Sequence, residues 1–130
     1  MDHKADLILN SSLGLELSTE DGNILGNLMR AVNLADGDYL IEEGTTDNAL
    51  HVVATGKLEV VKNSGTGDAA SLAVLREGDI AGELSFIDGQ QHTVGLRALC
   101  DSHVLSLDRE SFETIIDEHP QLVYKVMRAI

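Results

Sequence analysis

Glycine-containing turns divide the middle of this chain into short apolar runs. The turns are Asp36-Gly37-Asp38, Glu43-Gly44, Thr55-Gly56, Glu77-Gly78-Asp79, Asp88-Gly89 and a loop with Gly65 and Gly67. Runs of this length, rich in Val, Leu and Ile, are typical of strands. They predict strands over 39–42, 50–54, 57–62, 71–75, 92–98 and 104–107, with a hairpin at Gly65 and Gly67. Many short strands at close spacing indicate a sandwich, barrel or jelly roll.

Helical patterns flank this β region. A capping sequence, residues 18–21, precedes an apolar stripe from Ile24 to Val32, which predicts a helix to about residue 33. A shorter helix is expected over 5–10. Another helix is expected from Asp108 or Arg109 to Glu118, and Pro120 suits the first position of a last helix.

The last helix carries an apolar stripe on one face. Its members are Leu122, Val123, Val126, Met127 and Ile130. Such a stripe either covers the protein's own β-sheets or pairs with a second copy as a homodimer, and its spacing does not separate the two.

The net charge of −13 limits the partners that the chain can have. Its nine basic residues are scattered, so no basic stripe exists for a nucleic-acid backbone or an anionic membrane surface. No apolar run is long enough for a membrane span, and residues 7–9 are too short for a signal peptide. The single cysteine, Cys100, excludes an intrachain disulfide and suits a reducing, cytoplasmic location.

Sequence signatures of catalysis are missing. The chain has no nucleophile elbow and no phosphate loop, and its five histidines show no metal-ligand spacing. Asp36 and Asp38 resemble the start of a calcium loop, but no further ligands follow, and a turn capped by its own aspartates fits better. We therefore expect no catalytic residue, metal or cofactor.

Residues 82–93 have the features of an anion site. A helical turn that starts at Gly82 would direct unpaired backbone amides outward, and a glycine there leaves room for a phosphate. Glu83 can accept a hydrogen bond from a sugar hydroxyl, and Ser85 and Thr93 offer hydroxyl groups. After Asp88-Gly89 the chain returns, which brings His92 and Thr93 over the same place.

The order of these features along the chain resembles that of the cyclic nucleotide-binding domain family, which includes the sensor domain of the bacterial catabolite activator protein. The resemblance covers about residues 18–130. It depends on Gly37 to Gly44, Thr-Gly-Lys-Leu-Glu-Val at 55–60, Gly78-Asp79-x-x-Gly82-Glu83-Leu84, Leu96-Arg97-Ala98, Leu107-Asp108-Arg109-x-x-Phe112 and Pro120.

The resemblance implies an eight-stranded β-roll, a mainly β jelly roll (double-stranded β-helix), flanked by helices. It implies one domain over 1–130, helical to 33, β-roll at 36–108 and helical again at 109–130. No DNA-binding module is expected within these residues.

The family also implies a phosphate-binding cassette at 82–93. By position, Gly82, Leu84 and Ser85 would offer amides to a cyclic phosphate, Glu83 would hold the ribose 2′-hydroxyl, and Thr93 would match the hydroxyl that contacts phosphate or purine.

One position departs from the family pattern. The cassette usually ends Pro-Arg-Ser/Thr-Ala, and here it ends Gln91-His92-Thr93-Val94. Arginine offers a permanent bidentate charge, whereas histidine titrates near neutral pH, so binding could weaken by about one to two powers of ten. Arg97 matches the family's second arginine, which would brace Glu83, and it would face away from the phosphate.

The sequence therefore predicts a regulatory module that binds cAMP, cGMP or a related phosphorylated ligand with weakened or altered affinity. The alternative is a ligand-independent protein–protein interaction or dimerisation domain on the same fold.

Overall fold

A computed structural model describes residues 4–46, 48–62, 70–89 and 91–130. Eight strands form two four-stranded antiparallel sheets, ordered β1-β8-β3-β6 and β2-β7-β4-β5. The strands are β1 (Arg30–Leu34), β2 (Tyr39–Ile41), β3 (Leu50–Thr55), β4 (Leu58–Lys62), β5 (Ala70–Leu75), β6 (Ile80–Ala81), β7 (Gly95–Ala98) and β8 (Ser102–Leu107). The predicted fold class, mainly β with flanking helices, is confirmed.

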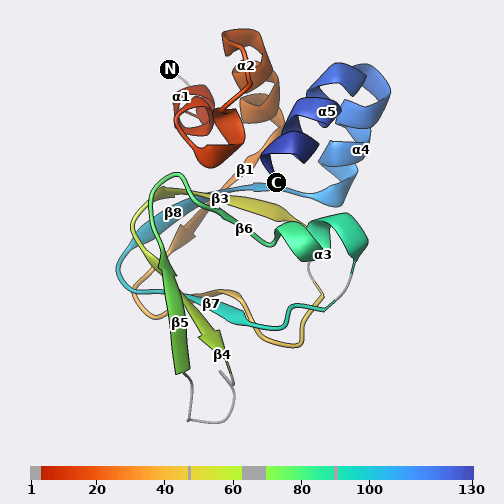
Figure 1. The fold of residues 1–130 in the computed structure, drawn as a ribbon. Helices are drawn as coiled ribbons and strands as arrows, with labels where there is room; N and C mark the ends of the chain where they lie inside the picture. Colours follow the sequence, from red (N-terminus) through yellow and green to blue (C-terminus); the bar gives the residue numbers. More distant parts are fainter. Residues whose placement is uncertain (1–3, 47, 63–69, 90) are drawn as a thin grey trace.

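Four of the helices gather on one side of the β-roll, next to the β1-β8-β3-β6 sheet (Figure 1). They are α1 (Lys4–Leu9), α2 (Thr19–Leu28), α4 (Arg109–Glu118) and α5 (Pro120–Ala129), and a 3-10 turn at Ser12–Gly14 follows α1. Helix α3 (Glu83–Asp88) stands apart, between β6 and β7 in the chain and close to α4 in the view. In the described ranges, no helix combines the length and the apolarity that a bilayer crossing requires.

Two predicted elements were wrong in extent. The helix expected to reach residue 33 ends at Leu28, and Arg30–Leu34 is strand β1, paired with β8 along its whole length. The strand expected over 92–98 begins only at Gly95, because the main chain of His92 pairs with a turn instead. The loop predicted at Gly65 and Gly67 lies outside the described residues.

A capping box starts α2 as the sequence predicts. The Ser18 hydroxyl accepts a hydrogen bond from the Asp21 N–H, and an Asp21 carboxylate oxygen accepts from the Ser18 N–H. The same carboxylate contacts Lys125 Nζ on α5 at 2.7 Å. This ion pair links the N-terminal and C-terminal helices, which lie side by side although they are far apart in sequence.

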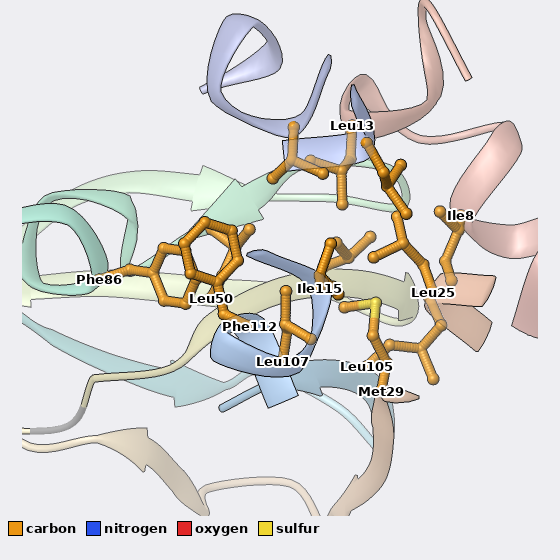
Figure 2. Packing of buried hydrophobic residues seen from close by; sticks show 14 residues of the cluster. Ile8, Leu13, Leu25, Met29, Leu50, Phe86, Leu105, Leu107, Phe112 and Ile115 are labelled. Atoms are coloured by element: carbon orange, nitrogen blue, oxygen red, sulfur yellow. The ribbon is translucent and has the colours of Figure 1, made fainter. Parts of the chain in front are cut away.

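The main hydrophobic core joins the helices to the first sheet. Its fully buried members include Ile8, Leu25, Leu50, Leu107 and Ile115, which come from α1, α2, β3, β8 and α4 (Figure 2). Aliphatic side chains fill most of this volume, in keeping with an aromatic content of only 3%. The helices therefore cover one sheet, and the cassette lies at the edge of the same core through Phe86 on α3.

The apolar stripe of α5 covers the protein's own core. Leu122 and Val126 are buried in the main cluster, and Val123 and Ile130 pack against it. Met127 is 40% exposed. Of the two uses that the sequence left open for this stripe, the structure shows the first.

Candidate functional site

Gly82 begins the predicted cassette with a left-handed backbone, φ +79°. A Cβ at this position would lie 2.8 Å from the Ala49 carbonyl oxygen and 3.3 Å from Cδ2 of His51. The sequence suggests a glycine that leaves room for a ligand. The structure shows a glycine required because the missing Cβ would point into the protein and because the chain must turn through a positive φ.

Helix α3 starts directly after this turn. The Phe86 N–H donates to the Gly82 carbonyl at 3.0 Å, so residues 83–85 form its first turn. The amides of a first helical turn have no intrahelical acceptor and are available to an anion. Glu83 is half-buried at this end of the helix. The side chains of Leu84 and Ser85 lie outside the described set.

The returning arm of the cassette, residues 91–93, is held by main-chain hydrogen bonds of His92. The Gly44 N–H donates to the His92 carbonyl at 2.8 Å, and the His92 N–H donates to the Thr45 carbonyl at 2.9 Å. The His92 side chain is buried, at 8% exposure, whereas Thr93 is exposed.

Both ends of the cassette therefore contact one segment, made of residues 41–46 and 48–51. Gly82 lies against Ala49 and His51, and His92 pairs with the turn at 44–45. The structure thus places the start of the predicted cassette, Gly82, and its end, at His92, against the same segment, which we call the wall. The roles of Gly82, Glu83, Leu84, Ser85, His92 and Thr93 toward a ligand stay predictions.

Lys62 is a site residue that was not predicted from the sequence. Its Nζ donates to the Thr93 carbonyl at 2.6 Å and lies 3.4 Å from a carboxylate oxygen of Glu43. A signal was present in the alternation of β4, because Leu58, Val60 and Lys62 share one strand face. Without the fold, nothing in the sequence shows that this face meets residue 93.

Arg97 does not brace Glu83, and that expectation was wrong. Its guanidinium donates to Glu59 on the neighbouring strand β4 at 2.6 Å. This bond, with a further one from Ser71, holds the pKa of Glu59 below its ordinary value against the opposing effect of burial. The same bond raises the pKa of Arg97. The pair joins the neighbouring strands β4 and β7 of the β2-β7-β4-β5 sheet.

A polar pair lies beneath the start of the cassette. His51 and Ser106 face each other across β3 and β8, with 2.6 Å between His51 Nδ1 and Ser106 Oγ. Both side chains are buried, and the ring of His51 is the one that a Cβ at Gly82 would approach. The floor of the cassette turn is therefore tightly packed.

Helix α3 is connected to α4 by an aromatic and cationic contact. The rings of Phe86 and Phe112 meet edge to face, with centroids 4.7 Å apart (Figure 2). Arg109 Nη1 donates to the Phe86 carbonyl at 2.6 Å, and its guanidinium lies 5.8 Å from both ring centroids. A displacement of α3 would therefore be felt directly at the start of α4.

No metal site is found in the part of the chain that the structure describes, since no three His, Cys, Asp or Glu side chains gather suitably there. The Asp36–Asp38 turn has the predicted form, because an Asp38 carboxylate oxygen accepts from the Ala35 N–H at 2.9 Å.

Comparisons with known proteins agree on the nature of this fold. A family model described as "Cyclic nucleotide-binding domain" matches residues 31–119. The N-terminal domain of a transcriptional regulator from Streptomyces coelicolor is 30% identical with a TM-score of 0.85, over 95% of this chain and 87% of that one.

Two curated relatives are much longer proteins. The neuropathy target esterase sws of Drosophila grimshawi is 30% identical over 76% of this chain, and the cGMP-dependent protein kinase egl-4 of Caenorhabditis briggsae is 28% identical over 91%. The chain spans 7% of the first relative and 16% of the second.

Proposed function

The chain belongs to the cyclic nucleotide-binding domain family, and on that premise we propose that it is a regulatory module whose cassette at 82–93 binds cAMP, cGMP or a related phosphorylated ligand. One observation carries the proposal: both ends of the cassette contact the segment made of residues 41–46 and 48–51, and the α3 amides begin directly after Gly82. The kinase relative, named as cGMP-dependent, supports the ligand class.

The phosphate and the ribose of the ligand each have a chemical counterpart in this arrangement. The amides of residues 83–85 would receive the phosphate, and the half-buried Glu83 carboxylate would accept from a ribose hydroxyl. His92 stands where the family has arginine and supplies fewer donors. We expect affinity for cyclic nucleotides to be weaker than an arginine-containing cassette would give.

Isothermal titration calorimetry with cAMP and cGMP tests the proposal. The wild type should bind, Glu83→Gln should weaken binding by about tenfold, and His92→Arg should strengthen it by about one power of ten. Glu113→Gln, an exposed change on α4, is the charge-matched control and should bind as the wild type does. No heat and no thermal shift at millimolar cyclic nucleotide would refute the proposal.

The contact between α3 and α4 supports the regulatory part of the proposal. A ligand bound to the α3 amides would favour one position of α3 over others. Because Arg109 and Phe86 connect α3 to α4, the change in position would be transmitted to α4 and α5. Hydrogen exchange of α4 amides should change on ligand addition, and Arg109→Ala should reduce the change. An equal change in wild type and variant would exclude this route.

A homodimer through the C-terminal helix remains part of the proposal. Because Leu122 and Val126 are buried in the protein's own core, a second copy would have to use Tyr124 and Met127, which are 63% and 40% exposed. Sedimentation equilibrium of the wild type and of Tyr124→Ser should show a dimer that the variant weakens. A monomer at all concentrations would contradict it.

The alternative is a ligand-independent interaction domain. It predicts that Glu83→Gln leaves partner binding unchanged and that no nucleotide raises the melting temperature. We further propose that the domain is not an enzyme and acts in the cytoplasm. Incubation with cAMP should return the cyclic nucleotide intact, and turnover would overturn the first of these statements.

A further inference from the structure

Two basic side chains donate to the main chain of the cassette within the described residues. Arg109 reaches the Phe86 carbonyl, beyond the first turn of α3, and its guanidinium lies 5.8 Å from the centroids of the Phe86 and Phe112 rings. Lys62 reaches Thr93, next to the position where the family arginine is replaced by His92. Of these two, Lys62 is the one that contacts the cassette beside the position of the family arginine.

Lys62 is the last residue of β4, and its hydrogen bond to the Thr93 carbonyl brings its ammonium to the cassette. The pairing of β4 with β7 runs without a break from Leu58 to Val61, whereas the pairing of β4 with β5 shifts register between Val60 and Val61. Glu59 points to the outer face with Arg97, whereas Val60 packs against the cluster of Ile41, Ala81 and Leu96. The position of the Lys62 ammonium is given by its hydrogen bond to the Thr93 carbonyl.

That cluster is adjacent to the start of the cassette. Ala81 directly precedes Gly82, and Ile41 Cδ1 lies 3.8 Å from where a Cβ of Gly82 would be. Strand β4 therefore contacts the cassette at two points: Lys62 reaches Thr93, and Val60 packs on the cluster beside the turn into α3.

On the basis of the proposed function, we propose that Lys62 supplies the positive charge of the phosphate subsite, in place of the missing arginine, and that Glu43 competes with the phosphate for it. The Lys62 side chain is 44% exposed and has a flexible stem, so its ammonium can turn from the Thr93 carbonyl toward a bound phosphate. In this structure the ammonium donates to the Thr93 carbonyl and lies 3.4 Å from a Glu43 carboxylate oxygen.

A purely structural role makes a different prediction. In that case Lys62 would be a staple that joins Thr93 to Glu43, and loss of either side chain would loosen the returning arm and weaken every ligand. In the proposed role the two side chains act with opposite sign, because Lys62 attracts a phosphate and Glu43 repels it.

Calorimetry compares cAMP and cGMP with adenosine and guanosine, which keep the base and the ribose but lack the phosphate. Lys62→Met should weaken cyclic nucleotides by about tenfold and nucleosides by less than about twofold. Glu43→Gln should strengthen cyclic nucleotides by about twofold. Lys62→Arg should restore binding, and Lys57→Met, an exposed change of equal charge, is the control.

Results that differ from these expectations contradict the inference, the proposed function or both. If Lys62→Met weakens nucleotides and nucleosides equally, or if Glu43→Gln weakens binding, Lys62 is a staple and the inference is wrong. If the wild type binds cyclic nucleotides and Lys62→Met binds them as well, the inference alone fails. A wild type that binds no phosphorylated ligand refutes both the inference and the proposed function. If Lys62→Met does not fold, the sign of the Glu43→Gln effect decides.

Discussion

Substitution of Gly82 by alanine should destabilise the protein by two separable effects. An L-residue in the left-handed region, here φ +79°, costs roughly 1–2 kcal/mol. The new Cβ would also lie 2.8 Å from the Ala49 carbonyl oxygen, a main-chain atom that cannot rotate away. Overpacking of this kind costs about 1–3 kcal/mol, so we expect a total of about 2–5 kcal/mol.

Gly37→Ala separates the two effects. Gly37 has φ +89°, but a Cβ there would have no heavy atom within 4 Å. It should lose only the roughly 1–2 kcal/mol of the backbone conformation. Alanine also reduces the entropy of the unfolded chain by about 0.4–1 kcal/mol, and this gain is common to both variants and cancels in their difference.

Urea unfolding followed by far-UV circular dichroism measures the difference, since the chain contains no tryptophan. Gly82→Ala should unfold at a lower urea concentration than Gly37→Ala. At equal m value, its free energy of unfolding should be lower by about 1–3 kcal/mol. Coincident midpoints would show that the wall beneath the cassette yields to a methyl group, and the packing described for Gly82 would then be wrong.

Three further perturbations test the framework that holds the cassette. Ser18→Ala should cost about 1 kcal/mol in urea unfolding through loss of the α2 cap, and an unchanged midpoint would contradict the capping box. Ile115→Ala should lower the free energy of unfolding by about 2–5 kcal/mol, because Ile115 is fully buried. The neighbouring Ile116 is 44% exposed, so Ile116→Ala should change it by less than about 0.5 kcal/mol. Equal effects of the two substitutions would contradict the packing of α4. The hydrogen bond from Arg97 lowers the pKa of Glu59. The stabilisation of the folded state by this pair is therefore fully present above the ordinary pKa of 4.5, and it is lost as the pH falls through the lowered pKa. The urea midpoint of Glu59→Gln should thus lie below that of the wild type at pH 7 and converge with it in acid, and a gap that persists there would exclude the linkage.

Local signals in the sequence were sufficient for most elements. The glycine turns located β2, β3 and β4 to within two residues at each end, because a positive φ or a tight turn is a property of one residue and its neighbours. Pro120 and Asp108 marked the starts of α5 and α4 for the same reason.

The end of α2 was not predictable in this way. The stripe from Ile24 to Val32 continues at helical spacing, yet Arg30–Leu34 forms β1. Its partner, β8, lies about seventy residues further along the chain, and the register of Arg30 with Ser106 exists only after both segments meet. Tertiary pairing here overrides a local pattern.

The sequence by itself determined the family, and it predicts the cassette at 82–93 with His92 in place of the family arginine, since both depend on residue types at fixed offsets. The tertiary structure alone decided the partners of the charged side chains. Arg97 pairs with Glu59 and Lys62 reaches Thr93 because antiparallel pairing sets β4 against β7, and cross-strand neighbours depend on register rather than on distance along the chain.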